Sequence, residues 1–203
     1  TPWHAIKDMW TGKKAEDEEK AKRKELQYDN LTGLYNMRAY AELEDSFMSK
    51  AAKRKKCLLV AMVDINGLDK INREEGRRKG DAVVSNVASV LKSFSENYPN
   101  MKVFRKEADR FLLLDVMNID KASATKERLE DVMRGMKMTD ADGVECQLVS
   151  FGFSVLKREN MGKGMKQVQE EAYFELKKTK RTQEKEYFER KKKTEQNKMN
   201  VLN

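Results

Sequence analysis

Histidine, cysteine and proline are scarce in this 203-residue chain, and the first two scarcities limit its chemistry. His4 is the only histidine and lies in a segment that we expect to be a tail, so a histidine-centred catalytic site is not expected. The two cysteines, Cys57 and Cys146, fall in apolar segments without a second cysteine or a histidine at ligand spacing. We therefore expect buried, reduced thiols rather than a disulfide or a zinc site.

Long apolar runs are missing as well. The longest extends from Cys57 to Val63, whereas a helix that crosses a bilayer needs about 20 apolar residues. We therefore expect no membrane span in this chain and a cytoplasmic location. The chain starts at Thr1 rather than at methionine, so we expect it to be a fragment, and the full-length protein can be tethered to a membrane.

The net charge of +8 is unevenly distributed along the chain. Residues 177–198 contain ten basic and four acidic side chains, whereas residues 29–176 carry a net charge of only +1. A basic tail of this kind raises the hypothesis that it binds nucleic acid or an anionic membrane. A solvated helix explains the same pattern, and the nearly neutral body gives no reason to expect nucleic-acid binding there.

Hydrophobic periodicity predicts alternating helices and strands. The strand at 57–65 is continuously apolar and ends in a carboxylate, Asp64, as a buried strand does beside a site at its carboxyl end. Two short strands surround the polar turn 105–110 and form a hairpin by pattern. The remaining predictions are a helix at 13–27, a helix from about 36, and helices at 67–75, 81–95, 123–136 and 165–178, a basic turn at 76–80, and a strand at 146–156. The helix at 165–178 is expected to run on into the basic tail.

These elements predict an α/β fold with a mixed central sheet of about five strands flanked by helices. We expect three segments: an N-terminal tail and charged connector helix in residues 1–27, a domain in residues 28–181, and a basic helical tail in residues 182–203. The connector helix suggests coupling to an upstream sensor domain.

Several motifs resemble those of the GGDEF family of diguanylate cyclases. The stretch DNLTGLYNMRAY at 29–40 is similar to the family's D-x-L-T-G-L-x-N entry. DINGLDKIN followed by GRRKGD, within 64–81, is similar to D-x-D-x-F-K-x-I-N-D-x-x-G-H-x-x-G-D. SFGFS at 150–154 and AYFELKKTKR at 172–181 match weaker motifs in the right order. The resemblance covers residues 28–181 and implies a palm-like nucleotidyl-cyclase fold.

The signature motif itself departs from the family. Where the family has R-x-G-G-D/E-E-F, residues 105–111 are RKEADRF, so both glycines are missing and Arg110 replaces a carboxylate close to the metals. A unit-charge pair about 4 Å apart is worth about 4 kcal/mol at an effective dielectric near 20, so a cation beside a dication is costly unless Arg110 turns into solvent. Asn66, Asp69 and Arg77 also replace the family's Asp, Lys and His.

What remains of the family's site is its binding side. The resemblance implies that Asp64 and Asp109, with the carbonyl of Ile65, hold Mg²⁺ or Mn²⁺ if a nucleotide is bound. Asn72 and Asp81 match positions that contact guanine. Each of these side chains also has a purely structural interpretation as a turn or helix cap. Two further matches, Lys177 and Arg181, correspond to phosphate-contacting residues one helical turn apart.

The residues leave three functional hypotheses open. The first is a degenerate GGDEF domain without cyclase activity that acts as a regulatory or interaction module in bacterial signalling, with GTP binding retained or lost. The second is an active diguanylate cyclase, in which two facing domains join two GTP molecules into cyclic di-GMP. Asp64 and Asp109 are then the catalytic metal ligands. Because two domains must face each other, the family resemblance implies a homodimer. The third is binding through the basic tail. The family's inhibitory product site, R-x-x-D, is replaced by Tyr98 and Met101 at its two ends, so product feedback is not expected.

Overall fold

The computed structural model describes residues 2–201, apart from the side chains of residues 2–8, 23, 24 and 201. Helix α2 (Met37–Ala51) begins at a side-chain cap. Asn36 caps this helix by accepting hydrogen bonds from the backbone N–H groups of Arg38 and Ala39. The α-helices are α1 (Pro2–Glu25), α2 (Met37–Ala51), α3 (Leu68–Glu75), α4 (Arg77–Ser95), α5 (Ala122–Gly135) and α6 (Gly164–Val201).

The central sheet has four strands in the order β2-β3-β1-β6. The central strand β1 pairs on one side with β3, where Asp64 is opposite Arg110, and on the other with β6, where Asp64 is opposite Ser150. This register brings the carboxyl end of β1 beside the β2–β3 turn. The strand bounds are β1 (Lys56–Ile65), β2 (Lys102–Arg105), β3 (Arg110–Asn118) and β6 (Val149–Lys157).

The α/β class with a sheet flanked by helices is confirmed, but the expected mixed pairing of about five strands is wrong in detail. All three pairings in the four-stranded sheet are antiparallel. The strands joined by a helical connection are parallel to each other but are not neighbours. Strand β3 lies between β1 and β2, and β1 lies between β3 and β6. Parallel pairing occurs only at the bridge between Tyr35 and Phe104 within the described part of the chain.

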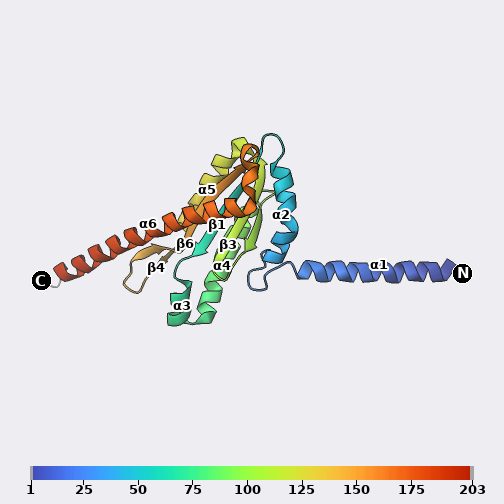
Figure 1. Ribbon diagram of the computed structural model, residues 1–203. Coiled ribbons are helices and arrows are strands. Elements are labelled where there is room, and N and C mark those ends of the chain that lie inside the picture. Colours follow the sequence, from blue (N-terminus) through green and yellow to red (C-terminus); the bar gives the residue numbers. More distant parts are fainter. Residues whose placement is uncertain (1, 202–203) are drawn as a thin grey trace.

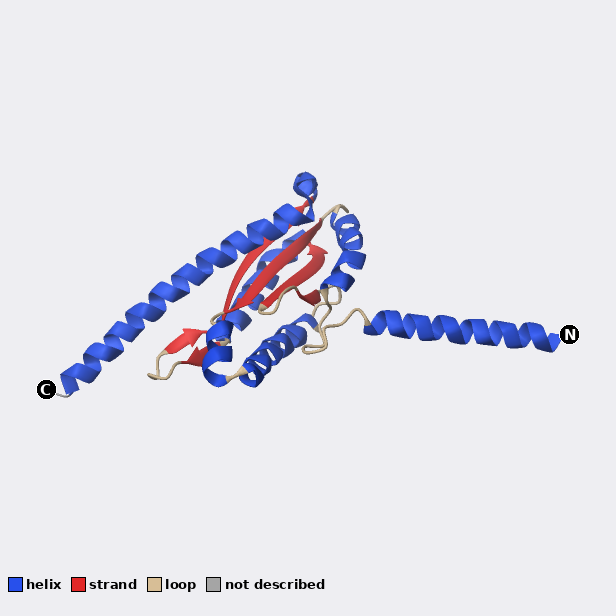
Figure 2. Ribbon diagram, turned by 60° about the horizontal axis from the view of Figure 1, so that its bottom comes forward, coloured by secondary structure: helices blue, strands red, loops and turns tan. Residues whose placement is uncertain are grey.

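Helices cover both faces of the sheet (Figure 2). On one face, α4 and α5 contribute Val87, Leu91 and Leu129 to a core that includes Val63 and Phe111. On the other face, α2 and α6 pack Phe47, Ala172 and Leu176 against a second apolar cluster. Because β1 is buried along nearly its whole length, its continuous apolar run is required by contact on both faces.

Two helices extend beyond this layered body (Figure 1). Helix α1 projects away at one side, and the C-terminal part of α6 extends past the sheet at the other. The described residues include no helix with the length and apolarity needed to cross a membrane.

The extended part of α6 contacts a small second sheet. Strands β4 (Lys137–Thr139) and β5 (Glu145–Gln147) form this hairpin. Tyr187 donates a hydrogen bond to Asp140, and the Lys191 ammonium lies 3.3 Å from an Asp140 carboxylate oxygen. The helix predicted from residue 165 runs on through the basic tail, as expected, and Lys191 of that tail has an acidic partner on the hairpin.

Two local predictions were wrong. In the segment predicted as a basic turn at 76–80, only Gly76 is outside a helix, because α4 starts at Arg77. Gly80 is inside α4, and the Asn72 side chain occupies the space that a Cβ at this position would need. The strand predicted at 146–156 is divided at Leu148. The N–H of Leu148 donates to the carbonyl of Met136, which comes just before the hairpin, and the carbonyl of Leu148 accepts from the N–H of Asn66. Residue 148 thus marks the change from the small sheet to the central one.

Candidate functional site

The candidate site is centred on Asp64 at the carboxyl end of β1. Its side chain is almost completely buried, and two cations hold it. The Arg110 Nη2 atom lies 3.2 Å from Asp64 Oδ2, and the Lys180 Nζ atom lies 3.2 Å from Asp64 Oδ1. Both carboxylate oxygens are therefore occupied by side chains of the protein itself. We call Asp64, Arg110 and Lys180 the ion triad.

Arg110 turns into the protein, so the alternative in which it swings into solvent is wrong. Its side chain is only 17% exposed, and its Nη1 atom donates to Glu107 at 3.0 Å. The guanidinium carbon lies 4.6 Å from the centre of the Tyr173 ring, within range of a cation–π contact. Burial opposes its charge, but the hydrogen bond to Asp64 and the nearby Glu107 raise the pKa of Arg110. Arg110 is thus fixed as a cation beside Asp64.

Lys180 was missed by the sequence analysis, which selected Lys177 and Arg181 on the same helix. The structure places Lys177 and Arg181 at the surface, and Lys177 lies over the Tyr173 ring. Lys180 instead follows the buried Leu176 by four residues, which puts it on the helix face that meets the sheet. That spacing is the signal that could have identified it.

Asp109 lies beside Asp64, as predicted, in the turn between β2 and β3. Its backbone carbonyl accepts a hydrogen bond of 2.9 Å from the N–H of Ile65, which fastens the turn to the end of β1. Burial and then the negative charge of Asp64 raise the pKa of Asp109. The structure therefore brings Asp64, Ile65 and Asp109 together at one end of the sheet.

Asn66 replaces the second aspartate of the family motif and is used structurally. Its Oδ1 atom accepts from the Ser150 hydroxyl at 2.7 Å, and its Nδ2 atom donates to Gln147 and Gln183. Gln183 in turn donates to the carbonyl of Val149. This network joins β1, β6 and α6 through residues that the sequence analysis did not connect.

Asn72 and Asp81 line a common pocket of about 280 Å³ between α3, α4 and the β2–β3 turn. Arg105 and Ala108 form its other wall. The Oδ1 atom of Asn72 is buried against Gly80 and has no hydrogen-bond partner among the described residues. The Arg105 guanidinium is held by the Asp29 carboxylate, with 3.0 Å between Nη1 and Oδ1. Burial alone would raise the pKa of Asp29, but the hydrogen bonds from Thr32 and Arg105 lower this pKa below its usual value. The pocket is therefore preformed and has a carboxylate and an amide in its wall.

The residues proposed for a divalent metal do not fit one in this arrangement. A metal needs free carboxylate oxygens, yet both oxygens of Asp64 are engaged by cations. A dication would have to displace Arg110 and Lys180 or lie beside them. Within the described residues, no group of three or more histidine, cysteine or acidic side chains is arranged to hold a metal ion.

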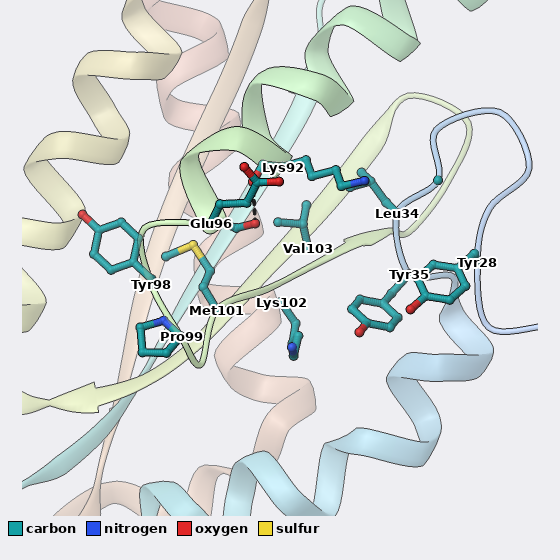
Figure 3. Close-up of a pocket in the computed structure, with 12 residues that line it drawn as sticks. Tyr28, Leu34, Tyr35, Lys92, Glu96, Tyr98, Pro99, Met101, Lys102 and Val103 are labelled. Atoms are coloured by element: carbon teal, nitrogen blue, oxygen red, sulfur yellow. Dashed lines mark hydrogen bonds between the residues drawn. The ribbon is translucent and has the colours of Figure 1, made fainter. Parts of the chain in front are cut away.

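The segment that corresponds to the family's product site forms a different pocket of about 400 Å³. Figure 3 shows Tyr98 and Met101 on one side, Tyr28 and Tyr35 on the other, and Lys102 between them. Tyr28 and Tyr35 are stacked with their ring centres 5.0 Å apart. Aromatic and aliphatic groups thus occupy the ends of the motif where the family has arginine and aspartate.

Comparisons with solved structures identify the same fold. The coiled coil and GGDEF domain of DgcB from Caulobacter crescentus, in complex with c-di-GMP, matches with a TM-score of 0.71 and 21% identity over 88% of this chain and 93% of that one. Diguanylate cyclase SiaD from Pseudomonas aeruginosa, in complex with its activator SiaC, matches with a TM-score of 0.63 and 20% identity over 87% of this chain and 70% of that one.

Sequence comparisons agree with the structural ones. An uncharacterized membrane protein of Staphylococcus epidermidis is 32% identical over 87 residues, which are 43% of this chain and 24% of that protein. The match therefore spans about a quarter of that relative. The model of the family described as "Diguanylate cyclase, GGDEF domain" matches residues 26–186. This match, together with the topology and the position of Asp64, shows that the chain belongs to the GGDEF-domain family.

Proposed function

We propose that this GGDEF domain lacks diguanylate cyclase activity and acts as a regulatory module that binds a guanine nucleotide. The ion triad carries the proposal, because Arg110 and Lys180 occupy both oxygens of the carboxylate that an active member would use for its metals. Metal ions bring positive charge to a phosphoryl-transfer site, and here Arg110 and Lys180 supply part of that charge. These side chains cannot bridge phosphates as a dication does.

The pocket between α3 and α4 supports retained nucleotide binding. A carboxylate such as Asp81 can accept two N–H groups of a guanine ring, and Asn72 offers an amide beside it. Lys177 and Arg181 are exposed on α6 and supply cations for phosphates. Binding therefore does not depend on a metal held by Asp64.

Helix α1 supports a role in signal relay. It projects from the body as a highly charged, exposed helix, as a connector to another domain does (Figure 1). In the proposed arrangement an upstream sensor in the full-length protein acts through α1, two copies associate through it, and the domain lies on the cytoplasmic side of the membrane. The nucleotide then acts as a signal rather than as a substrate.

Calorimetric titration with GTP tests the binding part of this proposal. We expect saturable binding that changes by no more than about threefold between buffer with Mg²⁺ and buffer with EDTA, because the bound phosphates meet side-chain cations. Asp81→Ala should weaken it by about 30-fold or more, since a carboxylate that pairs with the base is worth about 2 kcal/mol or more.

Asp131→Ala is the matched control, because Asp131 is exposed on α5 and does not line the pocket. Its affinity should equal that of the unmodified protein. An absence of GTP binding in both buffers would refute nucleotide binding. Binding that requires Mg²⁺ would instead refute the exclusion of metal from Asp64.

A further inference from the structure

The buried polar residues of the described chain fall into two groups. Asp64 is held by the ion triad, Ser150 by Asn66, and the Ser154 hydroxyl donates to Glu171 at 2.9 Å. The remaining two, Asp115 and Thr125, are 4% and 5% exposed, and their side chains have no hydrogen-bond or ion-pair partner among the described residues. Buried polar groups without partners are rare, because each costs the free energy of its lost hydration.

Both unpartnered residues line the same cavity. It has a volume of about 520 Å³ and lies between the end of β3, the segment that follows α4, and the start of α5. We call it the Asp115 cavity. Their side-chain oxygens are not completely occluded by the described residues. A ligand in the cavity can therefore reach them. The cavity is within the usual size range of small-molecule sites.

The Thr125 hydroxyl behaves differently from other threonines in helices. Thr179, Thr182 and Thr194 each donate to the backbone carbonyl four residues earlier, at 3.1 to 3.2 Å. This is the ordinary way for a helical threonine to satisfy its hydroxyl. Thr125 makes no such bond within the described structure, although it is the most buried of the four. Its hydroxyl is therefore left available to an occupant of the cavity.

The charge of Asp115 defines what the occupant must supply. Burial raises the pKa of Asp115 to about 6, so the carboxylate is mainly ionised at neutral pH without a compensating cation. Lys56 at the edge of the cavity is engaged elsewhere, because its ammonium donates to Asn118 at 2.7 Å. Lys121 and Arg128 line the cavity from exposed positions. The interior thus offers hydrogen-bond acceptors, and the exposed residues around it are net positive, although Asp120 is among them.

We infer that the Asp115 cavity binds a small zwitterionic molecule of the amino acid or aminophosphate class. Its ammonium or guanidinium group donates to Asp115 and Thr125, and its anionic group faces Lys121 and Arg128. The site lies at the opposite end of the sheet from Asp64, because Asp115 pairs with Leu59 near the start of β1. It is therefore separate from the nucleotide pocket and can regulate the domain independently of it.

Chemical-shift mapping of the ¹⁵N-labelled chain tests this inference. The probes are L-arginine, L-lysine and O-phosphoethanolamine, with propionate and inorganic phosphate as anions that lack the cationic group. We expect at least one zwitterionic probe to produce saturable shifts at the amides of residues 98, 100, 115–118 and 121–128. The two anions should not saturate these amides in the same concentration range.

Variants then identify the acceptor. Asp115→Asn keeps the shape of the side chain but removes its charge, so affinity should fall by about 30-fold, and Thr125→Val should weaken binding by about fivefold. Asp131→Asn is the matched control, because Asp131 is an exposed acid on α5 that does not line the cavity. Its affinity should not change.

Three results would overturn the inference: no saturable shifts with any zwitterionic probe, equal binding of the anions, or unchanged affinity in Asp115→Asn. Amide spectra away from the cavity verify that each variant is folded. Because GTP is not a probe, the outcome is independent of nucleotide binding at Asn72 and Asp81.

Discussion

At the scale of single residues, Asp64 is held by two cationic side chains of the protein itself. This aspartate lies near the carboxyl end of the buried strand β1. Arg110 and Lys180 each contact one of its carboxylate oxygens. The carboxylate has become part of the packing between β1, β3 and α6.

Removing one member of the ion triad should therefore destabilise the fold. Asp64→Asn leaves Arg110 and Lys180 without their shared acceptor charge, and we expect a loss of about 3 kcal/mol in the free energy of unfolding. The exposed Asp69→Asn should change it by no more than about 0.5 kcal/mol. Urea unfolding monitored by circular dichroism measures both. A loss below about 1 kcal/mol for Asp64→Asn would mean that the triad contributes little to stability.

Asp115 has the opposite effect, because its ionisation is disfavoured in the folded protein. Its pKa is raised to about 6 from the usual 3.8, so stability contributed by this group is greatest below pH 4, falls between pH 4 and pH 6, and is constant above that range. Asp115→Asn should consequently be more stable than the unmodified protein at pH 7, by at most about 3 kcal/mol, and nearly equal to it at pH 4.

Chemical denaturation at pH 4, 5, 6 and 7 measures this difference. Asp120→Asn, at an exposed position, should show no comparable pH dependence. A variant Asp115→Asn that is equally stable at every pH would show that the carboxylate carries no penalty for burial.

At the scale of the secondary-structure elements, helix α6 connects the central sheet, the candidate site and the small hairpin. It packs against β6 at Gly152, where a Cβ would clash with the backbone of Ala172 and Leu176. This close contact sets the position of the helix over the sheet. Lys180 and Gln183 reach Asp64 and Ser150 because of it.

Gly152→Ala should disturb that position. We expect it to reduce the free energy of unfolding by about 2 kcal/mol, because backbone rather than a flexible side chain must give way. Gly135→Ala at the end of α5 is the control, since no atom of the described structure lies within 4 Å of its added Cβ. Thermal unfolding compares the two variants, and equal melting temperatures would contradict the close packing of β6 on α6.

The sequence indicated the strands and the position of the site better than the side-chain contacts within it. The apolar run that ends at Asp64 and the hairpin that presents Asp109 sufficed to predict that the two carboxylates meet. The inward turn of Arg110 could not be predicted, because it depends on Tyr173 and Asp64 from other elements. Lys180 was missed because the rotation of α6 on the sheet follows from its packing at Gly152.

The turn at 76–80 was misjudged for a similar reason. Two glycines close together indicate a turn, but Gly80 is required by the Asn72 side chain that packs against it within the α3–α4 pair. The antiparallel sheet was missed because local periodicity does not reveal that each helical connection skips a strand. Both errors concern contacts between elements rather than the elements themselves.

At the scale of the whole molecule, the chain is a sheet domain with long helices at its two ends. Helix α1 leads away from the body, and α6 ends beside the acidic hairpin, where Lys191 and Lys198 pair with Asp142 (Figure 1). These ion pairs direct part of the tail's positive charge toward the protein itself.

The most direct test of this account is a turnover assay on the full chain fused at residue 1 to a parallel dimeric coiled coil. This fusion supplies the facing domains that cyclase chemistry needs. With GTP and either Mg²⁺ or Mn²⁺, chromatography should detect no cyclic di-GMP, because the ion triad keeps metal from Asp64. Formation of the dinucleotide by this fusion, and its loss in Asp64→Asn, would show that Asp64 still holds a catalytic metal and would contradict the account.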